Sequence, residues 1–70
     1  MRYISTAYFK GANLTDANLE GANLKDEDLS ETNFTGANLT DVDLSNANLR
    51  EANLTNANLT NANLTNANLT

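Results

Sequence analysis

The sequence has no Cys, no His, no Pro and no Trp among its 70 residues. Without Cys and His it has no disulfide framework, no thiolate or imidazole metal site, no Cys nucleophile and no His general base. Its four Lys and Arg stand against nine Asp and Glu, a net charge of −5 that argues against binding to nucleic-acid phosphates. No apolar run approaches the roughly 18 residues of a membrane-spanning helix. We therefore expect no catalytic, cofactor or metal site, no nucleic-acid or membrane partner, and a cytoplasmic setting.

The residues that are abundant, 11 Leu and 10 Ala, recur with a period of five. From Ala7 onward the chain divides into thirteen pentads, and we number the places within a pentad one to five. Every pentad has Leu or Phe at place three, and Ile4 fits the same register. These large apolar residues are the predicted core: Ile4, Phe9, Leu14, Leu19, Leu24, Leu29, Phe34, Leu39, Leu44, Leu49, Leu54, Leu59, Leu64 and Leu69.

A period of five suits neither a helix nor a flat strand. On an α-helix a step of five turns about 500°, so the Leu positions would not form a stripe. On a strand an odd period sends successive Leu residues to opposite faces. The pattern is explained if the chain turns a corner once per pentad, so that every place-three residue points inward. Four right-angle corners close a square of about 20 residues, and such coils stack at about 4.8 Å.

The other places support a corner. Place one is Ala in ten of the thirteen pentads, which fits a narrow interior. Place two is Asn or Asp in every pentad after the first, and we expect it to face water. Place five is Gly, Asn or Asp in ten of its twelve occurrences, and these residues best tolerate a left-handed turn. The sequence therefore predicts one left-handed corner per pentad, at place five.

The recurring motif, seen as Ala12-Asn13-Leu14-Thr15-Asp16, resembles the pentapeptide repeat family over residues 7–70. The resemblance implies an all-β fold, a right-handed quadrilateral parallel β-helix with the Leu or Phe and the Ala places inward. At about 20 residues per coil, residues 7–70 make a little over three coils with an uncapped C-terminus. Residues 1–6 are expected to form an N-terminal entry or capping segment that is partly in register.

Three pentads depart from Ala at the inward place one, with Glu27, Thr32 and Val42. A desolvated carboxylate is costly, so we expect the corner at Glu27 to distort and the carboxylate to reach solvent. Thr32 can bond its hydroxyl locally. Val42 is expected to overpack slightly or to fill space beside Ala22 and Ala62.

The sequence thus predicts a non-enzymatic structural or protein-interaction module, consensus-like or truncated in character. Its partner would be another protein, or a second copy bound through the open terminal coil. Two alternatives stay open. Some relatives are acidic rods that imitate DNA and bind DNA gyrase, giving quinolone resistance. The Thr column Thr15-Thr35-Thr55 could instead form an ice-binding surface.

Overall fold

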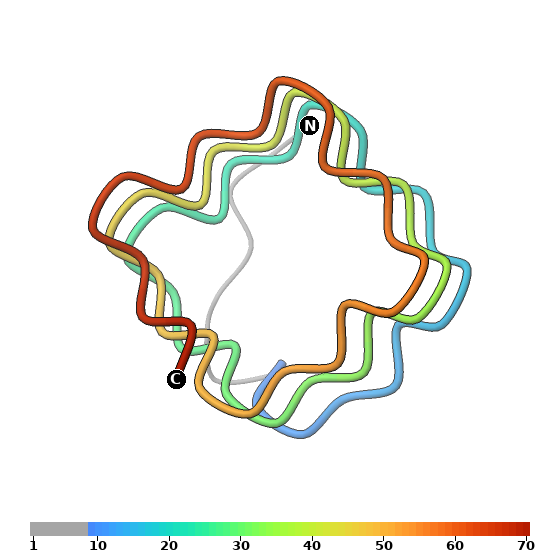
Figure 1. Ribbon diagram of the computed structural model, residues 1–70, viewed down its shortest axis with the longest axis horizontal. Coiled ribbons are helices and arrows are strands. Elements are labelled where there is room, and N and C mark those ends of the chain that lie inside the picture. Colours follow the sequence, from blue (N-terminus) through green and yellow to red (C-terminus); the bar gives the residue numbers. More distant parts are fainter. Residues whose placement is uncertain (1–8) are drawn as a thin grey trace.

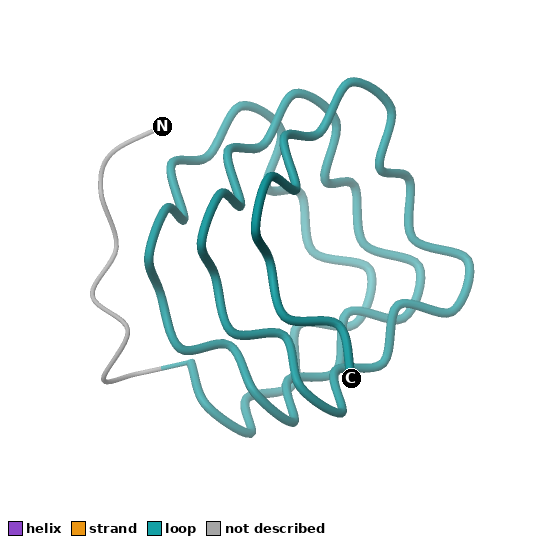
Figure 2. Ribbon diagram, turned by 60° about the vertical axis from the view of Figure 1, so that its left-hand side comes forward, coloured by secondary structure: helices purple, strands orange, loops and turns teal. Residues whose placement is uncertain are grey.

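The computed structural model describes residues 9–70, and these contain no helix and only isolated β-bridges in place of extended strands. The chain winds into coils with a four-sided outline (Figure 1), and the coils stack side by side along one axis (Figure 2). The C-terminus lies at one end of this stack. The expected entry segment 1–6, and Ile4 with it, fall outside the described residues.

Parallel β-bridges at place two join each coil to the next. The bridges run from Asn13↔Asn33 to Asn48↔Asn68, and each joins residues twenty apart. At the first bridge the Leu14 N–H donates to the Asn33 carbonyl at 2.7 Å, and the Asn33 N–H donates to the Ala12 carbonyl at 2.9 Å. A third bond runs from the Asp16 N–H to the Thr35 carbonyl at 2.8 Å. Three backbone bonds therefore hold each of these stacked pentads to the one beside it.

A four-residue turn closes each pentad. In the second pentad the Ala17 N–H donates to the Leu14 carbonyl at 3.1 Å, and Asp16 between them has a φ of 59°. A hydrogen-bonded turn with positive φ only at its third residue has the signs of a type II turn. Positive φ occurs at every place five: Gly11, Asp16, Gly21, Asp26, Glu31, Gly36, Asp41, Asn46, Glu51, Asn56, Asn61 and Asn66. The left-handed corner predicted from this column is confirmed, even at the two Glu positions.

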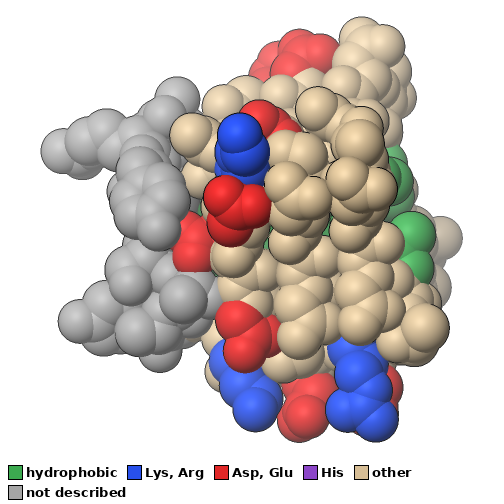
Figure 3. All heavy atoms as spheres, turned by 90° about the vertical axis from the view of Figure 1, so that its left-hand side faces the viewer, with side chains coloured by type: hydrophobic (Ala, Val, Ile, Leu, Met, Phe, Trp, Pro, Cys, Tyr) green, Lys and Arg blue, Asp and Glu red, His purple; other side chains and the backbone are tan. Residues whose placement is uncertain are grey.

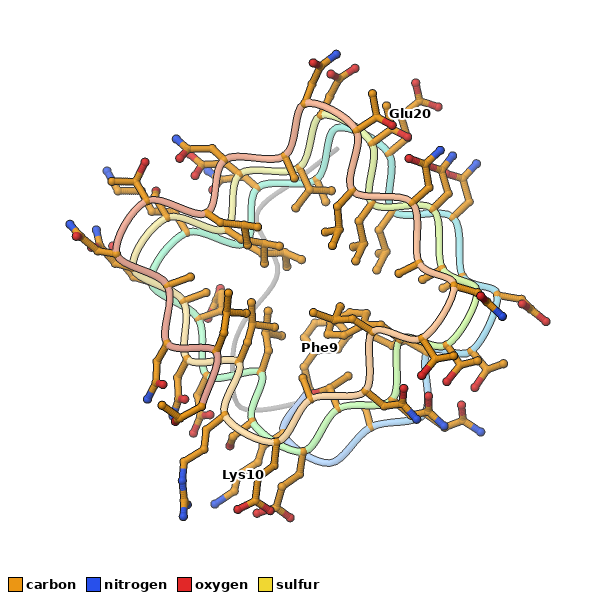
Figure 4. All side chains as sticks on the ribbon, in the orientation of Figure 1. Phe9, Lys10 and Glu20 are labelled. Atoms are coloured by element: carbon orange, nitrogen blue, oxygen red, sulfur yellow. The ribbon has the colours of Figure 1, made fainter. Side chains whose placement is uncertain are left out.

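The interior of the coils holds the apolar side chains of places one and three, whereas places two, four and five face outward. Phe9 points into the ring, and Lys10 and Glu20 point away from it (Figure 4). Burial is greatest in the middle of the stack. The buried place-three side chains are Leu19, Leu24, Leu29, Phe34, Leu39, Leu44 and Leu49.

Burial falls off toward the ends of the described chain. Phe9 and Leu14 at one end, and Leu54, Leu59 and Leu64 at the other, are only partly buried. Leu69 is 55% exposed, so its expected place in the core is wrong. A place-three side chain in the middle of the stack is enclosed by the coils on both sides of it, whereas the Leu residues of coil 51–70 have a neighbouring coil on one side only, and Leu69 is the most exposed of them.

Candidate interaction surfaces

The outer faces are built from Asn or Asp at place two and from the residue two positions later. The Asn13 Oδ1 accepts the Thr15 N–H at 3.0 Å and the Thr15 hydroxyl at 2.6 Å. Side chains of Asn and Asp commonly bond the backbone two residues on, which favours turns. The sequence analysis assigned place two to solvent and did not predict that its side chain also accepts hydrogen bonds from the residue two positions later. The sequence does contain a pattern that indicates these bonds, because Asn or Asp at place two is followed two residues later by Ser or Thr in most pentads.

The same pair of bonds recurs around the coils. The acceptors at place two with both a backbone and a hydroxyl donor are Asn13, Asp28, Asn33, Asn38, Asp43, Asn53, Asn58, Asn63 and Asn68. Where place four lacks a hydroxyl, as at Glu20, Lys25 and Arg50, only the backbone N–H donates. The outer faces are thus held in shape by local side-chain bonds as well as by the ladder between coils.

These bonds determine what the threonine column offers to a partner. The hydroxyls of Thr15, Thr35 and Thr55 each donate their proton to the Asn two residues earlier. A hydroxyl has one proton and two lone pairs, so an outside group meets an acceptor oxygen there. The donors on this side of the coil are the Nδ2 amides of the same Asn residues.

Glu27 is buried inside the first full coil of the described chain, residues 11–30. Its side chain is 2% exposed, and its Oε2 has no hydrogen-bond partner among the described residues. The expected escape of this carboxylate to solvent is therefore wrong. The backbone explains why, because the Glu27 N–H still donates to the Leu24 carbonyl at 3.2 Å and its carbonyl still accepts the Asn48 N–H at 2.9 Å. The ladder keeps the corner in register, and the side chain stays inside.

Thr32 and Val42 are also buried, at 0% and 1% exposure. The Thr32 hydroxyl donates to the Phe9 carbonyl at 2.6 Å, which is a bond to the neighbouring coil and corrects the expected local bond. The turn bonds that end at Glu27, Thr32 and Val42 measure 3.2 to 3.3 Å, whereas those that end at Ala measure 2.9 to 3.1 Å. The turn bond is therefore kept at all three residues, although their side chains are larger than a methyl group.

Two carboxylates at place two have lowered pKa values. The Ser30 hydroxyl donates to Asp28 at 2.7 Å and the Ser30 N–H at 3.1 Å, and these bonds hold the pKa of Asp28 below its ordinary value of 3.8. The hydroxyl and N–H of Ser45 lower the pKa of Asp43 in the same way, at 2.6 and 3.0 Å. Hydrogen bonds to the charged form favour that form.

The lowered values predict a defined acid sensitivity. A carboxyl group whose pKa is lower in the folded chain adds stability above its ordinary pKa, and this stability is lost as the pH falls through the folded pKa. Asp28→Asn with Asp43→Asn keeps the acceptor oxygens and removes the titration. We expect thermal unfolding, followed by circular dichroism from about pH 5 to about pH 2, to depend less steeply on pH in this double variant.

The matched control is Asp26→Asn with Asp41→Asn. It removes the same charge from two exposed corners, where φ is positive and Asn is well tolerated. Within residues 9–70 neither carboxylate makes a side-chain hydrogen bond, so the control keeps the acid sensitivity that comes from Asp28 and Asp43. An equal pH dependence in the parent and in the Asp28→Asn, Asp43→Asn variant would contradict the assignment.

The C-terminal edge of the stack is formed by coil 51–70. Backbone N–H groups at places three and five between Leu54 and Leu69, such as those of Leu54 and Asn56, make no hydrogen bond within the described chain. The carbonyls at its place one, such as that of Ala52, also accept none. Unpaired N–H and C=O groups along an edge are a template for pairing with another chain. The exposed Leu69 lies at the same edge. This edge is therefore a candidate site that offers a partner both hydrogen-bonding groups and apolar surface.

The comparison with family models identifies the repeat. The model described as pentapeptide repeats matches in eight copies, over residues 12–50 and 37–70. The chain belongs to the pentapeptide repeats. This family is generally non-enzymatic and implies a right-handed β-helix. The comparison with curated proteins gives no match.

The outward faces of this pentapeptide-repeat chain carry scattered charge. On the face that Figure 3 shows, acidic and basic side chains lie next to one another in groups, and wide uncharged surface lies between the groups. The ion pair in the described part of the chain joins Arg50 and Glu51 at 3.4 Å, with both side chains more than half exposed. Residues 9–70 contain no pocket, no group of acidic side chains arranged to hold a metal ion, and no helix long and apolar enough to cross a membrane.

Proposed function

We propose that this pentapeptide-repeat chain is a non-enzymatic interaction module, folded as a right-handed quadrilateral β-helix, that self-associates through coil 51–70. The observation that carries the proposal is the combination found at this edge. Leu69 is 55% exposed, and a row of backbone N–H groups beside it has no partner within the described chain. A sheet edge of this kind gains both hydrogen bonds and apolar burial when a second edge is added to it.

The outer faces support this choice, because their side-chain oxygens at place two already accept hydrogen bonds within the chain. The place-two oxygens of the outer faces accept bonds from their own pentads, and the acidic residues among these faces are dispersed. Coil 51–70, by contrast, keeps the donors that elsewhere in the stack hold two coils together. Its pentads repeat Asn-Leu-Thr with no charged residue after Glu51, so approach to this edge meets little electrostatic repulsion.

A substitution at Leu69 tests the proposal. Leu69→Glu places a carboxylate at the edge, where stacking would have to desolvate it at a cost of several kcal/mol. The side chain is mostly exposed, so the fold of one chain is expected to stand. We expect the mass of the parent, measured by light scattering over a rising concentration series, to exceed that of one chain, and the mass of Leu69→Glu to stay at one chain.

The matched control is Thr70→Glu, which adds the same charge one residue later at an exposed, outward position. We expect Thr70→Glu to associate nearly as the parent does. A parent that remains a single chain at every concentration would contradict the proposal, as would equal association of the parent and Leu69→Glu.

A further inference from the structure

The two edges of the stack differ in their hydrogen-bonding groups. Within the stack, each pentad donates from places three and five to the following coil and accepts at place one from it. The C-terminal edge therefore offers two N–H donors and one carbonyl acceptor per pentad. Over residues 52–61 these donors are the N–H groups of Leu54, Asn56, Leu59 and Asn61, and the acceptors are the carbonyls of Ala52 and Ala57.

The opposite edge, over residues 12–21, offers the reverse set. The carbonyls at places two and four have no donor within the described chain, and the N–H groups at place two have no acceptor there. The acceptors are the carbonyls of Asn13, Thr15, Asn18 and Glu20, and the donors are the N–H groups of Asn13 and Asn18. One edge thus has four donors and two acceptors, and the other has four acceptors and two donors.

We infer that the second copy stacks head to tail, with pentads 12–16 and 17–21 of one chain on the C-terminal edge of the other. This inference rests on the proposed self-association and specifies its geometry. Pentad 62–66 presents the same free groups as each pentad of residues 52–61, and residues 67–70 present those of places one and three. Pentad 12–16 of the second copy lies on residues 62–66, so the Leu64 N–H meets the Asn13 carbonyl of the second copy and the Asn66 N–H meets its Thr15 carbonyl. In this register Phe9 of the second copy does not overlap Leu69. Each donor finds an acceptor, as between the coils of one chain.

A two-fold arrangement of the two C-terminal edges lacks this match. Two facing pentads would bring four N–H donors but only two carbonyl acceptors together, so at least two donors would be buried with no acceptor. Each buried unsatisfied donor costs about 1–3 kcal/mol, so such a dimer is disfavoured. A head-to-tail contact joins two different surfaces and leaves one of each free, so it builds an open series of assemblies. The inference therefore predicts masses of two, three and more chains as the concentration rises.

Disulfide cross-linking tests the orientation, because the parent has no Cys. Thr15→Cys marks the exposed outer face of pentad 12–16. Thr55→Cys, Thr60→Cys and Thr65→Cys mark three sides of coil 51–70, whose pentads present the same edge. Stacked backbones lie about 4.8 Å apart, which is within the Cα separation that a disulfide spans. We expect Thr15→Cys to form a mixed disulfide with Thr65→Cys when the chains are oxidised together, and to form far less with Thr55→Cys or Thr60→Cys, which lie on other sides of the coil.

The controls separate a wrong orientation from a wrong function. Each Cys variant alone is oxidised in parallel, and under reducing conditions each is expected to keep the circular dichroism and the mass series of the parent. Association with disulfides only between two C-terminal markers would overturn the head-to-tail arrangement and leave the proposed function standing. Single chains at every concentration would overturn both.

Discussion

Glu27→Ala is expected to make the protein more stable, raising its melting temperature by about 10 °C. The parent buries this carboxylate at 2% exposure with Oε2 unpaired, which carries a desolvation cost of at least 1–3 kcal/mol. Ala at this place is the rule of the repeat, and Ala47 occupies the same place twenty residues later with 1% exposure. A net gain of about 2 kcal/mol shifts the melting temperature of a 60–100-residue domain by roughly 8–16 °C.

Two further variants isolate the cause of this gain. Glu27→Gln removes the charge but keeps a polar group inside the coil, so we expect a smaller rise than with Ala. Glu20→Ala removes an exposed carboxylate that points away from the ring, and we expect a change within about 0.5 kcal/mol (Figure 4). Thermal unfolding by circular dichroism at neutral pH measures all three. A lower melting temperature for Glu27→Ala would show that the buried carboxylate stabilises the fold.

Much of the fold followed from the period of five and from two columns of residues. The place-five column predicted the corners correctly, because positive φ is a local property that Gly, Asn and Asp favour and that the turn bond fixes. Glu31 and Glu51 show how firmly the ladder sets the corner. They lack this preference, yet they adopt φ values of 62° and 60° like their neighbours.

The sequence was a poorer guide where the outcome depended on neighbouring coils. Glu27 was assigned to solvent on its own polarity, but the bonds from its backbone to the adjoining residues keep the side chain inside. The Thr32 hydroxyl donates to the carbonyl of Phe9, which is 23 residues away in the sequence. A prediction based only on the residues next to Thr32 could not identify this partner. The sequence also could not predict which edge has more N–H donors. Every residue of the repeat has the same backbone N–H and C=O groups, and only the stacked structure shows which of them point toward each edge.

Leu29→Ala and Leu69→Ala are expected to differ widely in stability, although both shorten the same kind of side chain in the same repeat. Leu29 is 0% exposed, and removing its buried methyl groups costs about 2–5 kcal/mol. A chain of this size has a total stability of only about 3–10 kcal/mol, so Leu29→Ala should lower the melting temperature by 10 °C or more. Leu69 is 55% exposed, and we expect Leu69→Ala to cost less than about 1 kcal/mol in dilute solution.

The concentration dependence of this difference links stability to association. If a second copy stacks on coil 51–70, Leu69 becomes buried and its truncation becomes more costly. The melting temperature of Leu69→Ala should then fall further below that of the parent as the protein concentration rises, since binding to the folded state adds stability by mass action. The deficit of Leu29→Ala should change much less, because Leu29 is buried in every chain. A large and constant deficit for Leu69→Ala, equal to that of Leu29→Ala even in dilute solution, would mean that Leu69 is enclosed within a single chain.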